Sequence, residues 1–117
     1  MNELKTLKEV CQLLNVSRRV IQGYEKYNLV QIPFKNKYGH NLYNEETIER
    51  MIKIRFYQIM GFKLKDIEIF IDEDNIKDIL IDKLNALKEE LNNKQKELLL
   101  IEDIINGKKD INEIIKK

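Results

Sequence analysis

The side chains in this sequence that offer specific chemistry are cations and amides in two neighbouring segments. The first segment is a helix expected from Ser17, its N-cap, to Lys26, with one polar face and one apolar face. Its apolar face includes Ile21 and Tyr24 at helical spacing. Guanidinium and amide groups on such a helix suit hydrogen bonding to base edges and phosphates in the major groove of DNA. The polar face carries Arg18, Arg19 and Gln22.

The second segment interleaves cations, aromatic rings and one glycine after Pro33, which excludes a helix there. Two short strands, Val30–Ile32 and Asn41–Tyr43, are expected to pair around a basic loop at Lys35–Gly39. A hairpin of this kind beside a helix is the plan of a winged helix. For Tyr24, a phosphate contact through the hydroxyl and a ring that only fills the core are both open. The residues expected to contact DNA are Ser17, Arg18, Arg19, Gln22, Tyr24, Lys35, Lys37, Tyr38, His40, Asn41 and Tyr43.

Further helices must hold these two segments in place. A helix at Leu7–Leu14, with Thr6 and Glu9 as a capping box, is joined to the arginine-bearing helix by a short turn. So short a turn requires a steep crossing, as in a helix-turn-helix. Asn44 is expected to cap a third helix, and a short fourth helix follows at Leu64–Ile71. The residues expected on the buried side of the first helix are Leu7, Val10, Leu13 and Leu14, with Cys11 at the edge.

A single long helix is expected from Asn75 to Asn106. Its apolar residues alternate four and three apart with one polar interruption, which is the pattern of a coiled coil. A domain this small cannot bury such a seam, and a second copy of the chain is the simplest partner. Lys94 either sets the register of the pair or has no role, while Asp110 is expected to cap a last turn, Ile111–Ile115, that folds back. The seam comprises Leu80, Leu84, Leu87, Leu91, Lys94, Leu98, Ile101 and Ile105.

Length and charge set the expected organisation of the chain. The 117 residues suffice for one small domain, expected at residues 1–73, and a helical extension at residues 74–117. The expected fold class is mainly α: a winged helix-turn-helix DNA-binding domain followed by a long coiled-coil dimerisation helix. Residues 1–71 carry 12 Lys and Arg against 8 Asp and Glu, whereas residues 72–117 carry 9 against 12. The basic portion is therefore expected to face a polyanion.

Other classes of protein are excluded by the composition. No run of about 18 apolar residues is present, so no membrane span is expected and the protein is expected in the cytoplasm. Cys11 is the sole cysteine and His40 the sole histidine, which leaves neither an intrachain disulfide nor a metal site. Without a catalytic constellation or a glycine-rich phosphate loop, neither an enzyme nor a cofactor is expected.

Taken in order, these residues resemble the MerR family of bacterial transcription regulators over about residues 4–71. The resemblance implies a homodimer joined by an antiparallel coiled coil, with double-stranded DNA as a partner and RNA polymerase as a further one. It implies that the helix at Ser17–Lys26 enters the major groove, that the wing contacts the flanking backbone, and that the dimer bends and untwists a promoter with widely spaced elements. The matching residues are Leu7–Val10, Val16–Arg19, Tyr24–Lys26, Gly39, Tyr43, Asn44–Glu46, Gly61–Phe62 and Leu64–Ile67.

The chain departs from the family pattern in three ways. Gln22 and Gly23 stand where the family usually has Arg and an aromatic residue, and His40 and Asn41 stand where it usually has Tyr and Arg. Only about ten residues follow the coil, so no effector-binding domain is expected. The expected function is a sequence-specific transcription regulator that acts as a homodimer on promoter DNA. The alternative is an architectural or DNA-anchoring protein, chromosome-organising or excisionase-like, with a MerR-like head.

Overall fold

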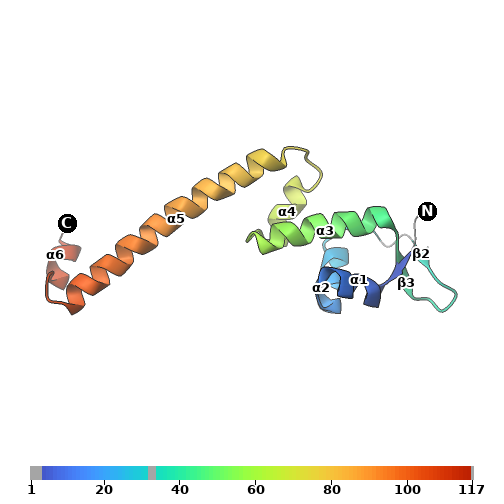
Figure 1. Ribbon diagram of the computed structural model, residues 1–117, viewed down its shortest axis with the longest axis horizontal. Helices are drawn as coiled ribbons and strands as arrows, with labels where there is room; N and C mark the ends of the chain where they lie inside the picture. Colours follow the sequence, from blue (N-terminus) through green and yellow to red (C-terminus); the bar gives the residue numbers. More distant parts are fainter. Residues whose placement is uncertain (1–3, 32–33, 117) are drawn as a thin grey trace. The chain divides into compact units, whose positions relative to one another are not determined.

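The computed structural model describes residues 4–31 and 34–116 (Figure 1). Contacts between residues divide the chain into two compact units, Met1–Glu73 and Asp74–Lys117. The described part is mainly helical, with one small antiparallel sheet in the first unit. Within the described ranges, no helix is both long enough and apolar enough to cross a membrane.

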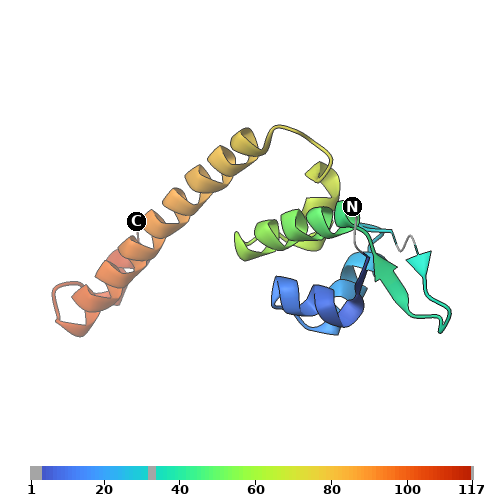
Figure 2. The same cartoon turned by 45° about the vertical axis from the view of Figure 1, so that its right-hand side comes forward.

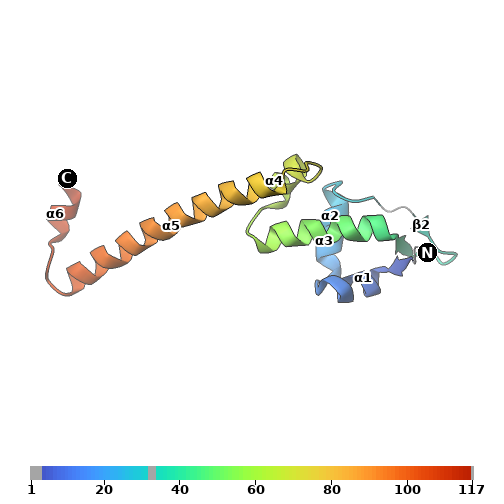
Figure 3. The same cartoon turned by 45° about the horizontal axis from the view of Figure 1, so that its top comes forward.

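The described part of the first unit contains four helices, and α1 has the bounds that the sequence predicts. The capping box at its start is confirmed, because the Glu9 amide donates to the Thr6 hydroxyl at 3.2 Å and the Thr6 amide donates to the Glu9 carboxylate at 3.0 Å. Figure 3 shows α1 and α2 running in steeply different directions, as expected of two helices joined by so short a turn. The helices are α1 (Leu7–Leu14), α2 (Arg18–Lys26), α3 (Glu45–Ile59) and α4 (Leu64–Phe70).

The caps of α2 and α3 differ. Ser17 has the extended backbone of an N-cap residue, but its side chain makes no capping hydrogen bond within the described chain, so the predicted side-chain cap is wrong. The cap of α3 is confirmed, since the Thr47 amide donates to the Asn44 side chain at 2.9 Å. The turn between α1 and α2 is instead held by Asn15, which adopts a left-handed conformation with φ 54°.

The sheet has the strand order β1-β3-β2, with β1 at Lys5–Thr6, β2 at Phe34–Lys35 and β3 at Asn41–Tyr43. The pairing predicted for Val30–Ile32 is wrong: Phe34 pairs with Leu42, Val30 is buried outside any strand, and Ile32 lies outside the described residues. A tight loop between β2 and β3 sets this register, and it places β2 closer to the turn than the sequence predicts. The strand β1 was not predicted, because two residues are too few to show an alternating pattern.

The core of the first unit lies where α1, α2, α3, α4 and β3 meet. Leu13 was predicted in this core but is 55% exposed, whereas Leu7 and Leu14 are partly buried. The buried face of α1 is centred on Val10, and at about 100° per residue Leu13 lies about 60° to one side of it, where the helix meets solvent. The fully buried side chains include Val10, Ile21, Tyr24, Tyr43, Met51, Ile54, Tyr57 and Ile67.

Two cations of α3 hold the end of the first unit. The Arg50 Nε donates to the carbonyl oxygen of Leu29, and its terminal nitrogen lies 2.5 Å from the Asp72 carboxylate. The hydrogen bond from Arg50 lowers the pKa of Asp72. The Lys53 ammonium donates to the Ile71 carbonyl at 3.0 Å. The segments that follow α2 and α4 are therefore both bound to one side of α3.

The second unit consists of α5 (Ile76–Ile105) and the short α6 (Ile111–Ile115). The single long helix predicted here is confirmed, and at 1.5 Å per residue its 30 residues span about 45 Å. The cap of α6 is also confirmed, since the Asn112 amide donates to the Asp110 carboxylate. Ile114 of α6 shares an apolar hollow with Leu100, Ile101, Ile104 and Ile105 of α5, so α6 does fold back (Figure 2).

Thr6 caps α1 through its side chain, whereas Ser17 does not cap α2 in this way. Removing the two hydroxyls should therefore change the stability by different amounts. Thr6→Ala should lower the free energy of unfolding by about 1 kcal/mol, because it deletes the acceptor of the capping box. Ser17→Ala serves as the control and should change it by less than about 0.5 kcal/mol, since no side-chain cap is lost. Urea unfolding followed by circular dichroism measures both values. An equal cost for the two variants would show that the hydroxyl of Ser17 caps α2 in solution.

Candidate nucleic-acid interface

The orientation of α2 is fixed by its buried face. Ile21 and Tyr24 are fully buried, and the Tyr24 hydroxyl donates to the side-chain oxygen of Gln58 on α3 at 2.6 Å. Burial raises the pKa of Tyr24, so its hydroxyl remains a neutral donor. With this face fixed, the exposed residues of α2 point away from the core. They are Arg18, Arg19 and Gln22, together with Lys26.

Tyr43 supports α2 from the sheet. It is fully buried, and its hydroxyl donates to the Glu25 carboxylate. Burial, reinforced by this carboxylate, raises the pKa of Tyr43. The hydroxyls of Tyr24 and Tyr43 thus both bond to partners inside the domain, Gln58 and Glu25 respectively. Both bonds help to fix the position of α2 in the domain.

The wing is the hairpin of β2, β3 and their loop, and Asn36 shapes it. The Asn36 side-chain oxygen accepts hydrogen bonds from the backbone amides of Tyr38 and His40, both at 2.9 Å, and the backbone N–H of Asn36 donates to the His40 carbonyl at 3.0 Å. Gly39 has φ 80°, a conformation that side chains rarely adopt. Sequence analysis missed this role of Asn36. An asparagine side chain often bonds to the backbone two residues further on, and this is a known turn signal.

The side chains at the wing tip are exposed and close to one another. Tyr38 is 72% exposed, the Lys37 ammonium lies 5.1 Å from the centre of its ring, and the His40 ring lies 6.3 Å away from it. A cation over an aromatic face is attracted by the ring's quadrupole. The tip therefore presents cationic and aromatic groups together, as the sequence predicts.

A hollow beside the wing joins three elements, and we call it the wing hollow. It brings Arg18 of α2 together with Lys35, His40 and Asn41 of the wing, all of which were predicted to contact DNA. It also adds Lys8 of α1, which sequence analysis missed because that helix was assigned a supporting role. The wing hollow is lined by Thr6, Leu7, Lys8, Arg18, Lys35, Gly39, His40 and Asn41.

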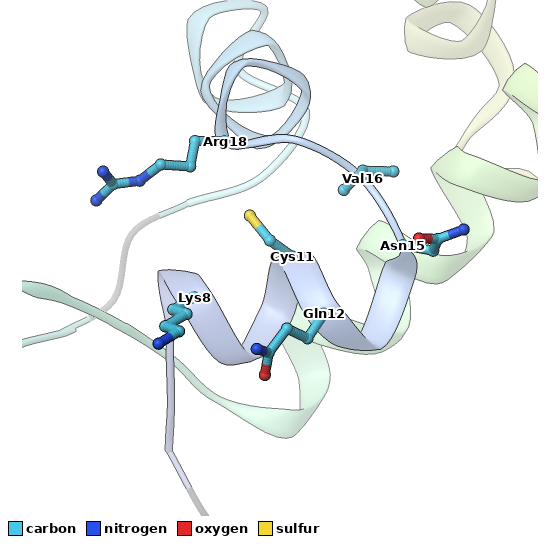
Figure 4. A pocket seen from close by; sticks show the side chains of 6 residues that line it. All are labelled: Lys8, Cys11, Gln12, Asn15, Val16 and Arg18. Atoms are coloured by element: carbon cyan, nitrogen blue, oxygen red, sulfur yellow. The ribbon is translucent and has the colours of Figure 1, made fainter.

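A second hollow lies between α1 and the start of α2 (Figure 4). Figure 4 shows the Arg18 side chain extending from the start of α2, and the Cys11 thiol directed into the space between the helices. Cys11 is partly buried, as predicted for a small residue at the edge of the core. Among the described residues, no group of His, Cys, Asp and Glu is arranged to hold a metal ion.

The position usually taken by an aromatic residue is occupied by Gly23, which faces α4. A Cβ atom placed on Gly23 would lie 3.9 Å from the Leu64 side chain, an ordinary contact distance. The first turn of α4 therefore lies beside the middle of α2. Lys63 and Lys65, on either side of Leu64 in the sequence, are both exposed.

The predicted seam of α5 is exposed along this single chain. None of the thirty residues of α5 is buried within the described chain. The large apolar residues of the seam from Leu84 to Ile105 are between 45% and 76% exposed. Lys94 lies 3.3 Å from the Glu97 carboxylate, and both side chains are mostly exposed. So much exposed apolar surface on one helix is typical of a surface that another helix covers.

Comparison with protein families gives a match over most of the first unit and the start of the second. Residues 5–74 match the domain described as "MerR HTH family regulatory protein". The HTH-type transcriptional activator mta of Bacillus subtilis (strain 168) is 26% identical over 105 residues, which cover 82% of this chain and 41% of that protein. The mercuric resistance operon regulatory protein of Bacillus cereus is 28% identical over 60 residues, 51% of this chain and 46% of that protein. The chain thus spans less than half the length of these curated relatives.

Solved structures share the fold. The N-terminus of the Bacillus subtilis multidrug transporter activator, MtaN, superposes with a TM-score of 0.79 at 23% identity, covering 86% of this chain and 97% of that chain. HiNmlR, a MerR family regulator lacking the sensor domain and bound to promoter DNA, gives a TM-score of 0.54 at 17% identity, covering 91% and 80%. The family match covers residues 5–74, which contain both the helix-turn-helix and the wing. The chain therefore belongs to the MerR family of helix-turn-helix regulatory proteins.

Proposed function

We propose that this chain is a sequence-specific transcription regulator that acts as a homodimer on promoter DNA. The observation that carries the proposal is the surface formed by the exposed face of α2 and the wing. There Arg18 lies in one hollow with Lys35 and His40, while the opposite face of α2 is buried. Phosphate contacts and base contacts then come from one continuous surface, as a winged helix requires. The family match and the DNA-bound neighbour support this proposal.

Within this surface, we assign the recognition helix to bases and the wing to the backbone. Arg18 lies in the first turn of α2, where side chains reach furthest into the groove. Gln22 lies one turn further along the same face, and its amide matches the acceptor and donor that adenine presents side by side. Lys35 and Lys37 lie on the hairpin, where their ammonium groups act as point charges toward phosphates. Lys63 and Lys65 are further candidates for phosphate contacts.

The dimer is proposed on the exposed seam of α5. A seam that repeats every seven residues is buried when a second helix of the same pattern packs against it. The chain supplies that second helix in another copy of itself, and the family resemblance implies an antiparallel pair. Two recognition helices would then read two half-sites, so the bound site should have two-fold symmetry.

The experiment that tests the proposed function is selection of bound sites from genomic fragments, followed by transcription in vitro with bacterial RNA polymerase from the best site. A regulator should recover a few symmetric sites within promoters and change the transcript level from them. Many weakly related sites, with no effect on transcription, would contradict the proposal and favour an architectural protein. Failure to recover any DNA would exclude both functions.

The assignment of helix and wing predicts different effects of two alanine variants. Gln22→Ala should lose about 1–3 kcal/mol of discrimination at one position in each half-site, because the amide pair with the base is lost. Lys37→Ala should weaken all sequences alike and reduce the slope of log K against log salt by about one per subunit. Competition binding on single-base variants of the selected site measures both. If Lys37→Ala reorders the variants and Gln22→Ala does not, the assignment is reversed.

The proposed seam predicts the oligomeric state. Leu87→Ala with Leu91→Ala should give monomers at micromolar concentration, because each truncation of a packed core leucine costs roughly 2–5 kcal/mol. Glu89→Ala with Lys96→Ala is a matched control, since these residues lie away from the seam and the pair keeps the net charge. The control should remain dimeric in sedimentation equilibrium. An unmodified chain that sediments as a monomer would refute the proposed dimer.

The positioning role of Tyr24 predicts a loss of stability without a loss of phosphate contacts. Tyr24→Phe should lower the free energy of unfolding by about 1 kcal/mol, because the Gln58 side chain loses its buried partner. The salt dependence of DNA binding should stay unchanged. Tyr38→Phe is the control, since its hydroxyl is exposed and its loss should not affect stability. A salt slope reduced by Tyr24→Phe would show that the hydroxyl does reach a phosphate in the complex.

A further inference from the structure

The wing hollow contains four side chains that carry or can acquire a positive charge. Lys8 comes from α1, Arg18 from α2, and Lys35 and His40 from the wing. None of the described residues that line this hollow is acidic. Residues with cationic side chains from three separate elements thus line one concave surface.

We propose that the wing hollow binds one phosphate of the DNA backbone and that His40 takes up a proton when it does. DNA binding by this chain therefore strengthens as the pH falls through the range in which histidine titrates. The inference deepens the proposed function and rests on it, because it takes DNA as the ligand of this surface.

The backbone of His40 is held in place, while its ring is free to meet a ligand. The Asn36 side-chain oxygen accepts a hydrogen bond from the backbone amide of His40, and the backbone N–H of Asn36 donates to the His40 carbonyl. These two bonds fix the backbone of His40, and its ring centre lies 6.3 Å from that of Tyr38. Because the His40 side chain is exposed, a bound phosphate can approach its ring nitrogens.

Electrostatics then couples protonation of His40 to binding. A phosphate bound in the hollow favours the protonated imidazole of His40, since an opposite charge within about 4–6 Å stabilises the charged form. Linkage requires the converse: whatever protonates His40 also raises the affinity for DNA. Histidine is the only side chain whose ordinary charge change falls between about pH 5 and pH 8.

The other groups around the hollow keep their charge across this range. Glu9 of α1 stays ionised, because hydrogen bonds from the backbone and then the side chain of Thr6 lower its pKa. Tyr43 of β3 stays neutral, because burial and the Glu25 carboxylate raise its pKa. Lysine and arginine side chains stay protonated throughout. The cations on the surrounding elements are Lys5, Lys8, Arg18, Arg19, Lys35 and Lys37.

The test measures affinity for one fluorescent duplex, recovered by selection, between about pH 6 and pH 8 at constant ionic strength. Ionic strength must be held constant because phosphate contacts depend strongly on salt. The proteins compared are the unmodified chain, His40→Gln, His40→Lys and, as a control outside the hollow, Lys37→Gln. Calorimetry in two buffers of different ionisation enthalpy counts the protons taken up on binding.

If binding raises the pKa of the His40 ring by one unit, the affinity of the unmodified chain for the duplex should be about fivefold higher per subunit near pH 6 than near pH 8. His40→Gln should bind weakly and His40→Lys tightly, both without pH dependence or proton uptake. Lys37→Gln should bind less tightly but keep the pH ratio.

Two results would overturn the proposal. One is an unmodified chain that binds the duplex with no pH dependence, and the other is a His40→Gln variant that retains the dependence. Either result leaves the proposed function standing, because DNA binding itself is observed. An unmodified chain that binds no duplex at any pH would overturn the proposed function as well.

Discussion

The burial of the inner face of α2 is the constraint on which the DNA-facing surface depends. With nine residues, α2 is too short to be stable alone, so tertiary packing must hold it. Ile21 and Tyr24 supply that packing, and the bond from Tyr24 to Gln58 fixes the rotation of the helix about its axis. Tyr43 adds a second tie through Glu25. Because the inner face is fixed at these points, the direction of the outer face is determined as well.

Features governed by neighbouring residues could be predicted from the sequence. The bounds of α1, its capping box and the caps at Asn44 and Asp110 each depend on a few consecutive residues. The register of β2 could not be predicted, because it depends on how Asn36 closes the loop. Neither could the missing side-chain cap at Ser17, since suitable residue type does not ensure the required geometry.

The residue types that make up the candidate site could be predicted from the sequence more fully than their arrangement in space. The exposed positions of Arg18 and Gln22 follow from helical periodicity alone. A tyrosine at the same periodicity looks identical whether its hydroxyl faces solvent or another helix, so the partners of Tyr24 needed the tertiary structure. Lys8 was missed for a similar reason: its role comes from the wing folding beside α1, a contact between residues distant in sequence.

Arg50 and Lys53 bond to the segment at residues 71–72, just beyond the end of α4. They lie three residues apart on α3, the longest helix of the first unit, so one face of that helix holds this segment. The same Arg50 side chain holds the carbonyl of Leu29, the second residue after the C-cap of α2. A single guanidinium group thus joins the segment after α4 to the segment after the recognition helix, so the two chain ends cannot shift independently while both bonds hold.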